Sequence, residues 1–192
     1  MLFRKSVKGL SDEALMNRVK DGNERAMEEI YHRHGRSLLR YFLRMLWKDK
    51  NKSEDFLHDL FVKIIEKGDQ FDATKKFSTW IYSIAHNMCK NEYRKQALRT
   101  SVQLHASRFE YADESVTRHL DHESFEKKLD AILKEEDEEI RSIFFLRHEQ
   151  GLSFPEIAEI LCCPEGTVKS RLFYLTKKLA FELDHYKIML EK

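Results

Sequence analysis

The sequence predicts an all-α protein made of two small helical domains. Its 192 residues contain only two Pro and six Gly, so few residues interrupt long helices. Apolar residues recur at helical spacing in an N-terminal and a C-terminal block, and this periodicity weakens between residues 100 and 122. We therefore predict one helical domain over residues 1–100, a flexible acidic linker over residues 101–123 and a second helical domain over residues 124–192.

The N-terminal domain is expected to be a bundle of four helices. These cover about residues 11–20, 24–47, 53–67 and 77–99. An Asp-Gly-Asn turn at residues 21–23 separates the first two helices, and Gly68 ends the third. Gly35 is expected to interrupt or bend the second helix, whose apolar residues include Leu38 and Phe42.

The C-terminal domain begins with two expected helices, over residues 124–134 and 140–150. The second carries an apolar run at residues 143–146, is expected to be buried and ends at Gly151. Residues 151–179, GLSFPEIAEILCCPEGTVKSRLFYLTKKL, then predict a helix, a four-residue turn and a further helix. This order is typical of a helix-turn-helix module.

Local signals define both helices of this module. Ser153 and Glu156 have the S-x-x-E spacing of a capping box, and Pro155 lies in the first turn, where its missing N–H costs little. The second helix carries an apolar seam that must pack inward. This seam consists of Val168, Leu172, Leu175 and Leu179.

A basic and aromatic face is expected on the outside of that second helix. On a helical wheel of about 100° per residue, Arg171 and Lys178 lie on the flank of this face. The side opposite Val168 presents Lys169, Ser170, Phe173, Tyr174 and Lys177. Cations for phosphates and polar groups for base edges are what a major-groove helix needs. The spacing favours DNA binding, although two ordinary amphipathic helices with solvated lysines would have the same pattern.

Two separate segments resemble one protein family. The run GTVKSRL at residues 166–172 is close to a signature of the promoter-reading domain, sigma domain 4, of bacterial RNA polymerase sigma factors. Residues 53–96 resemble sigma domain 2 of the same sigma-70 family, and the match is best to its extracytoplasmic-function (ECF) group. The resemblance implies a sigma subunit that binds core RNA polymerase, recognises the −35 and −10 elements of promoter DNA and assists promoter melting.

The resemblance assigns the −35 element to the last helix of the module. The implied DNA-binding residues are Thr167, Lys169, Ser170, Arg171, Phe173, Tyr174, Lys177 and Lys178. Tyr174 stands where arginine or histidine is common in the family. This departure replaces a charged contact by stacking or by a single hydrogen bond, and it affects the choice of bases.

The resemblance assigns the −10 element to the fourth helix. The implied residues are Trp80, Tyr82, His86, Asn87, Met88, Lys90, Asn91 and Arg94. Residues 85–91 correspond to the family segment around the loop that captures a flipped base. Aromatic rings can hold unstacked bases while cations hold the phosphates, although the spacing of Trp80 is more typical of a core residue.

The third helix is the implied contact with the polymerase. Its implied binding residues are Asp55, His58, Asp59, Phe61 and Lys63. In the family this helix docks on a coiled coil of the largest catalytic subunit, and His58 stands where glutamine is usual. Without the resemblance, the same residues would suggest a solvated helix face.

Charge is distributed unevenly along the chain. Residues 1–100 hold 21 Lys and Arg against 14 Asp and Glu, a net charge of +7, whereas residues 101–140 hold 5 against 12, a net charge of −7. The near-neutral total of +1 is therefore compatible with DNA binding. The acidic run KEEDEE at residues 134–139 replaces a usual Leu-Pro turn, and we expect it to point away from DNA.

Other functional classes have weaker support. A helix-turn-helix regulator with an N-terminal sensor or dimerisation domain would not explain the match at residues 53–96. The sequence lacks a Gly-rich phosphate loop and a nucleophile elbow, so no enzymatic activity and no cofactor are expected. His32, His34, Cys162 and Cys163 lack the paired spacing of a zinc site, so no metal is expected.

Location and regulation are also expectations at this point. No run of eighteen apolar residues and no signal peptide are found, so a cytoplasmic protein without membrane insertion is expected. The three cysteines fit a reducing compartment better than a disulfide framework. The family resemblance further implies an anti-sigma factor as an inhibitory partner.

Overall fold

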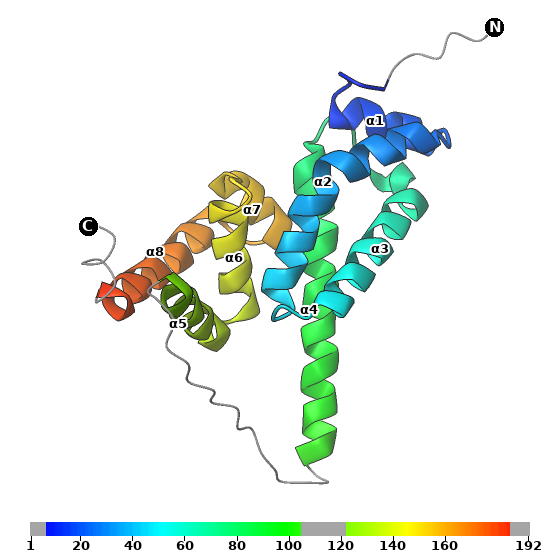
Figure 1. Ribbon diagram of the computed structural model, residues 1–192. Helices are drawn as coiled ribbons and strands as arrows, with labels where there is room; N and C mark the ends of the chain where they lie inside the picture. Colours follow the sequence, from blue (N-terminus) through cyan, green and yellow to red (C-terminus); the bar gives the residue numbers. More distant parts are fainter. Residues whose placement is uncertain (1–6, 105–121, 185–192) are drawn as a thin grey trace, which may run out of the picture.

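The computed structural model describes residues 7–104 and 122–184, and in this part of the chain all regular structure is helical. Helices α1 to α4 form one lobe of the molecule, and α5 to α8 form the other (Figure 1). Their bounds are α1 Asp12–Lys20, α2 Glu24–Met45, α3 Lys50–Glu66, α4 Phe77–Leu104, α5 His122–Glu135, α6 Glu138–His148, α7 Phe154–Leu161 and α8 Glu165–Glu182. The expected all-α class with two helical domains is confirmed, while most of the expected linker lies outside the described residues.

Capping side chains fix the helix starts in the N-terminal domain. Ser11 Oγ accepts the N–H of Ala14 at 3.2 Å, so Ser11 is the N-cap of α1 rather than its first residue. Helix α3 begins at Lys50, three residues before its predicted start, because Asp49 Oδ1 accepts the N–H of Lys52 at 3.0 Å. The sequence prediction missed this cap.

Helix α2 is continuous through Gly35, so the expected interruption is not found, while the alternative expectation of a bend stays a prediction. Gly35 is buried, and a Cβ at this position would lie 3.6 Å from the Tyr31 ring, an ordinary van der Waals distance. One glycine costs a helix about 1 kcal/mol, and packing of the neighbouring apolar residues offsets it. Leu38 and Phe42 are fully buried, as expected.

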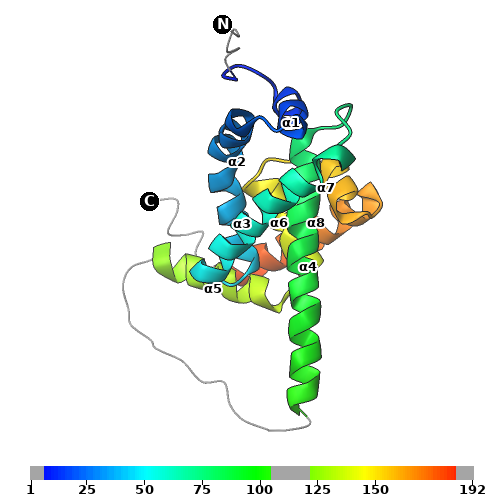
Figure 2. The same ribbon diagram turned by 90° about the vertical axis from the view of Figure 1, so that its right-hand side faces the viewer.

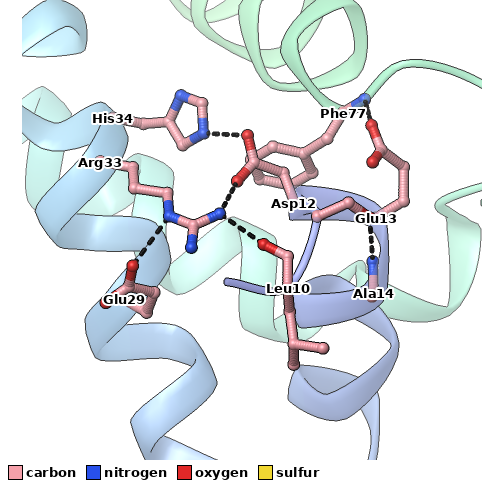
Figure 3. Close-up of polar contacts among 9 residues, drawn as sticks. Leu10, Asp12, Glu13, Ala14, Glu29, Arg33, His34 and Phe77 are labelled. Carbon is pink, nitrogen blue, oxygen red and sulfur yellow. Dashed lines mark hydrogen bonds and ion pairs between the residues drawn. The ribbon is translucent and has the colours of Figure 1, made fainter. Parts of the chain in front are cut away.

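A polar cluster fastens α1 to α2 and α4 (Figure 3). The Asp12 carboxylate accepts from Arg33 Nη1 at 2.8 Å and lies 2.7 Å from His34 Nε2. Glu13 Oε1 accepts the backbone N–H of Phe77 at 3.1 Å, and this bond lowers the pKa of Glu13. Because Phe77 is the first residue of α4, the cluster fixes the start of the helix that carries the predicted −10 residues.

The two lobes are packed against each other. Helix α4 lies beside α7, and α2 lies beside α6, an arrangement that can be followed in both ribbon views (Figures 1 and 2). Buried apolar residues of both lobes form one continuous cluster. The contact between the lobes was not predicted from the sequence. This contact determines which of the expected site residues reach the surface.

Candidate nucleic-acid interface

Local hydrogen bonds and one left-handed residue define the two ends of α7 and the turn that leads to α8. Glu156 Oε2 accepts the backbone N–H of Ser153 at 2.7 Å and its hydroxyl at 2.5 Å, which fixes the start of α7. Cys162 then adopts a left-handed conformation with φ of 52° and ends α7. The N–H of Cys163 closes this end by donating to the carbonyl of Ala158 at 3.0 Å. Helix α8 is thereby set at a fixed angle to α7.

The outward face of α8 has the composition that the wheel predicted. The predicted seam residues Val168, Leu172, Leu175 and Leu179 are all buried. Lys169, Ser170 and Lys177 are exposed on the opposite face. Phe173 and Tyr174 are 64% and 69% exposed, and their ring centroids lie 5.6 Å apart with nearly perpendicular planes. Two neighbouring exposed rings beside cations are typical of a binding surface rather than of an ordinary solvated helix.

Two flanking cations of α8 are engaged by the acidic run at residues 134–139. Arg171 Nη1 donates to Glu139 Oε2 at 2.6 Å, and Lys178 Nζ donates to Glu136 Oε1 at 2.8 Å. These bonds raise the pKa of Lys178 and lower the pKa of Glu139. Opposite charges therefore hold this run beside the flank of α8, and its expected direction away from DNA stays a prediction. Thr167 is half-buried at the start of α8.

The predicted −10 residues of α4 fall into three groups, which are exposed, half-buried and buried. Asn87, Asn91 and Arg94 are exposed. Trp80, Met88 and Lys90 are half-buried, and the Trp80 ring lies 5.1 Å from that of Phe71, which agrees with its core-like spacing. Residues 85–91 lie within the continuous helix α4, so the loop expected there is not found. The segment that links the short 3-10 turn Gly68–Gln70 to α4 is residues 71–76.

Tyr82 and His86, the remaining predicted −10 residues, are covered by the C-terminal domain. They are 4% and 2% exposed, so their expected exposure to DNA is not found in this arrangement. The Tyr82 hydroxyl donates to Gln150 Oε1 at 2.7 Å, and His86 Nδ1 lies 3.1 Å from the Ser142 hydroxyl. Burial lowers the pKa of His86 to about 4 and raises that of Tyr82 well above its ordinary value. Both side chains are therefore uncharged and already hydrogen-bonded.

Ion pairs surround this buried contact. Lys75 donates to Glu159 at 2.7 Å and Lys76 donates to Glu156 at 2.8 Å, which joins the segment before α4 to α7. Nearby, Lys90 Nζ donates to Glu139 Oε1 at 3.1 Å. In each pair the cation comes from the N-terminal domain and the carboxylate from the C-terminal domain. The uneven charge distribution of the sequence thus becomes a contact between domains.

Arg44 and Arg141 make further contacts at the boundary between the two domains. These contacts were not predicted from the sequence. Arg44 donates to Glu149 at 2.9 Å and to Asp130 at 3.3 Å. Arg141 is 5% exposed, and its guanidinium lies 4.2 Å from the centroid of the Trp47 ring. An arginine in an apolar helix gives no local sign that an aromatic ring of another domain will cover it.

Helix α3 presents a second candidate surface. Asp55, His58 and Asp59 are exposed, as expected for a docking face, and Lys63 is half-buried. Phe61, another predicted contact, is only 7% exposed and packs against Tyr31 with ring centroids 4.8 Å apart. A predicted direct contact by Phe61 is therefore limited to the small part of its ring that is exposed.

An apolar groove of about 730 Å³ runs beside α3 toward α2. Val62 and Ile65, which the sequence prediction missed, line it and are 39% and 60% exposed. Three exposed carboxylates also line the groove, namely Glu24, Glu28 and Glu54. An apolar groove with acidic residues fits an amphipathic helix that carries basic residues beside its apolar face.

The described parts of the chain contain neither a candidate metal site nor a membrane-spanning helix. In the described parts of the chain, no group of three His, Cys, Asp or Glu side chains is placed to hold a metal ion. His34 is instead paired with Asp12, and the three cysteines are free thiols. None of the described helices has the length and apolarity needed to cross a bilayer.

Two protein-family models match this chain. The model for Sigma-70 region 2 matches residues 30–99, which include α3 and most of α2 and α4. The model for Sigma-70, region 4 matches residues 137–179, which include α6, α7 and most of α8. Both segments that resemble sigma domains in the sequence are therefore matched, in the same order.

Relatives with known functions match over most of their length. The ECF RNA polymerase sigma-E factor of Haemophilus influenzae is 30% identical over an alignment of 175 positions that covers 85% of this chain and 90% of that protein. The RNA polymerase sigma-H factor of Pseudomonas aeruginosa is 28% identical over an alignment of 171 positions that covers 84% of this chain and 88% of that protein.

Solved structures agree in fold. CnrH in complex with the cytosolic domain of CnrY has a TM-score of 0.68 at 24% identity and covers 91% of this chain and 97% of that chain. The sigma factor RpoE from Bartonella quintana, in complex with the anti-sigma factor NepR, has a TM-score of 0.65 at 21% identity, with 82% and 96% covered. The sequence relatives and the two family models lead to one conclusion: this chain belongs to the sigma-70 family of RNA polymerase sigma factors, in its ECF group.

Proposed function

We propose that this sigma factor recognises the −35 promoter element with the outward face of α8. The observation that carries the proposal is the exposed ring pair of Phe173 and Tyr174 beside Lys169 and Lys177. Lysines contact phosphates and position the helix, whereas base edges and thymine methyl groups are read by polar and apolar side chains. Because Tyr174 is uncharged, we expect it to select bases by stacking or by one hydrogen bond.

The −10 element is assigned to α4 in the same proposal. Asn87 and Asn91 are one helical turn apart and both exposed, so they present amide groups on one face. Arg94 continues this polar stripe with a cation for the phosphates. Tyr82 and His86 can take part only after the C-terminal domain has moved away from α4.

The polymerase-binding surface is assigned to α3 and the groove beside it. Asp55 and Asp59 are four residues apart on the exposed side of α3, and Val62 and Ile65 supply apolar area next to them. Carboxylates around an exposed apolar strip complement a helix of opposite charge. We expect core RNA polymerase to bind this surface.

The solved relatives suggest an inhibitory partner for this chain. CnrH was solved with the cytosolic domain of CnrY, and RpoE with the anti-sigma factor NepR. We propose that an anti-sigma factor also binds this chain. We further propose that this chain works in the cytoplasm, where the polymerase and the promoters are. The chain acts by binding alone, with no catalytic step of its own.

In vitro transcription on a random promoter library tests the proposal. The full chain with core RNA polymerase is expected to give transcripts that start downstream of shared −35 and −10 sequences, while the chain alone binds duplex promoter weakly. Tight sequence-specific binding by the chain alone, without promoter-dependent transcripts, would support the alternative of a helix-turn-helix regulator.

A further inference from the structure

A cationic cavity of about 270 Å³ lies where the end of α2 meets α5 and α6, and none of its lining residues has a role in the proposed function. Five of the ten lining residues are cationic and one is acidic. The cations are Arg44, Lys48, Lys127, Lys134 and Arg141, and the acid is Asp130. A hollow lined mostly by one sign of charge concentrates ions of the opposite sign, so the natural occupant of this cavity is an anion.

Carboxylates of the chain neutralise only a part of this charge. Asp130 accepts from Arg44 at 3.3 Å and also pairs with Lys48, while Arg44 donates to Glu149 at 2.9 Å. Five cations against these two carboxylates leave a surplus of three positive charges. A carboxylate ligand supplies one negative charge, whereas a phosphate monoester supplies nearly two and has three acceptor oxygens. A phosphate monoester therefore matches the cavity better.

Arg141 contributes a buried donor that no other group uses. It is 5% exposed, and its Nη1 donates to the carbonyl of Glu136 at 2.5 Å. Its Nε is buried and has no hydrogen-bond partner within the described residues. A buried donor without a partner is costly, and charged donors form strong hydrogen bonds with phosphate oxygens. A phosphate in the cavity would remove this cost.

Rings and apolar side chains complete the lining. The Trp47 ring is 40% exposed, with the Arg141 guanidinium 4.2 Å and Lys134 Nζ 5.9 Å from its centroid. Leu133 and Phe145 add buried apolar surface. A flat ring can stack on the exposed part of Trp47 while a charged group attached to it reaches the cations.

The backbone at Trp47 is held in a conformation that side chains rarely adopt. Trp47 and Lys48 have φ values of 57° and 63°, two successive left-handed residues that are not glycine. Strained residues of this kind persist only where the surrounding structure holds them, and they are concentrated at ligand-binding sites. Strain and the unused donor of Arg141 thus occur in one cavity.

We propose that this cavity binds a phosphate monoester attached to a flat ring, either a nucleoside monophosphate or a smaller aryl phosphate. The phosphate lies beside Arg141 Nε, Lys127 and Lys134, and the ring packs against Trp47. The ligand is small, because clefts for drug-sized molecules begin at about 300 Å³. It touches both domains, since the lining comes from the end of α2 and from α5 and α6.

Titration calorimetry of the full chain tests the proposal with adenosine monophosphate, phenyl phosphate, inorganic phosphate and benzoate. At least one ring phosphate is expected to bind with a Kd below about 1 mM. It should bind at least about tenfold more tightly than inorganic phosphate, which lacks the ring, and than benzoate, which carries a single charge. Tighter binding of adenosine monophosphate assigns the cavity to nucleotides, and tighter binding of phenyl phosphate assigns it to smaller aryl phosphates. No binding of either ring phosphate at about 1 mM, or equal binding of inorganic phosphate or benzoate, would overturn the proposal.

Substitution of exposed lysines locates the bound phosphate. Lys127→Gln with Lys134→Gln removes two cations of the cavity and leaves the buried Arg141 in place. The matched control is Lys50→Gln with Lys128→Gln, which removes the same charge from exposed positions outside the lining. The test variant is expected to bind the ring phosphate at least about tenfold more weakly, and the control no more than about twofold. Equal affinities of the two variants would show general attraction to a basic surface and refute the site.

Tryptophan fluorescence locates the ring. The chain has two tryptophans, so Trp80→Phe leaves Trp47 as the only one. We expect the bound ring phosphate to quench the fluorescence of Trp47 in this variant, and inorganic phosphate to leave it unchanged. Calorimetric binding without a change in this fluorescence would contradict the placement of the ring and overturn the proposal.

Discussion

His86 of α4 and Ser142 of α6 face each other across the domain boundary, with the imidazole Nδ1 3.1 Å from the hydroxyl oxygen. Ser142 is fully buried and lies 2.8 Å from the Tyr41 hydroxyl as well. Burial and, to a smaller extent, the nearby cation of Lys90 together lower the pKa of His86 to about 4, while the carboxylate of Glu139 opposes this shift. The buried contact therefore favours a neutral imidazole.

The first prediction concerns pH. The pKa of His86 is about 4 in the folded chain and 6.5 as an ordinary value, so the unfolded chain binds the proton more tightly. Stability is then fully present above pH 6.5 and is lost as the pH falls toward 4. The loss from this group is expected to be about 2 kcal/mol at pH 5, measured by urea unfolding at pH 7.5 and pH 5.

The control for this prediction is His86→Gln, which keeps a polar side chain but cannot take up the proton. Carboxylates whose pKa values are lowered, such as Glu139 and Glu156, titrate in wild type and variant alike. The difference between the two pH profiles therefore isolates His86. Parallel profiles would mean that the imidazole is accessible to water in the folded chain.

The second prediction concerns the outward face of α8. Lys169→Ala is expected to weaken binding of the holoenzyme to all promoters alike and to reduce the salt dependence of binding by about one ion. Tyr174→Ala is expected to weaken binding by about 1–3 kcal/mol on the preferred −35 sequence only. Lys128→Ala, an exposed lysine of α5, is the control. Promoter binding over a range of salt concentrations and −35 sequences checks the effects of both substitutions. If the substitutions weakened polymerase binding as much as promoter binding, the assignment of this face of α8 to DNA would be contradicted.

Elements defined by neighbours in the sequence were predicted well. The apolar seam of α8 has a helical period, and Ser153 and Glu156 are three residues apart, so the sequence alone gives their positions. Local reading still missed the cap Asp49, because residues 50–55 after it are all polar or charged and start no apolar period. It also allowed for an interruption at Gly35 that α2 does not have, because packing can outweigh the helix propensity of a single residue.

The arrangement of the domains could not be read in the same way. Tyr82 and Gln150 lie 68 positions apart, and neither carries a local pattern that points to the other. Glu139 belongs to a charged run whose expected orientation followed from its charge and from an assumed DNA partner. The structure supplies nearer cations, Lys90 and Arg171, and these determine where the carboxylate lies.

The third prediction concerns α3. Asp59→Arg and Ile65→Glu are each expected to weaken binding to core polymerase by at least about tenfold, because one reverses a docking charge and the other places a charge on apolar contact area. Both positions are exposed, so the free energy of unfolding should change by less than about 0.5 kcal/mol. Glu66→Arg, at the end of the same helix and outside the groove lining, is the matched charge reversal. Competition between each variant and the wild type for core polymerase measures the affinity. If Glu66→Arg lost as much affinity as the two test variants, the groove would have no specific role in polymerase binding.

The fourth prediction concerns the turn of the DNA-reading module. Cys162 has a φ of 52°, a conformation that costs a side chain with a Cβ about 1–2 kcal/mol. Glycine adopts it without that cost but loses more entropy on folding, so Cys162→Gly is expected to raise the free energy of unfolding by about 0.5–1 kcal/mol. The neighbouring Cys163→Gly should lower it instead, because Cys163 packs against the core and has no positive φ. If glycine relieves backbone strain at residue 162, urea unfolding should show changes of opposite sign in the free energy of unfolding of the two variants. A loss of stability in both variants would mean that the thiol of Cys162 stabilises the fold by more than its backbone conformation costs.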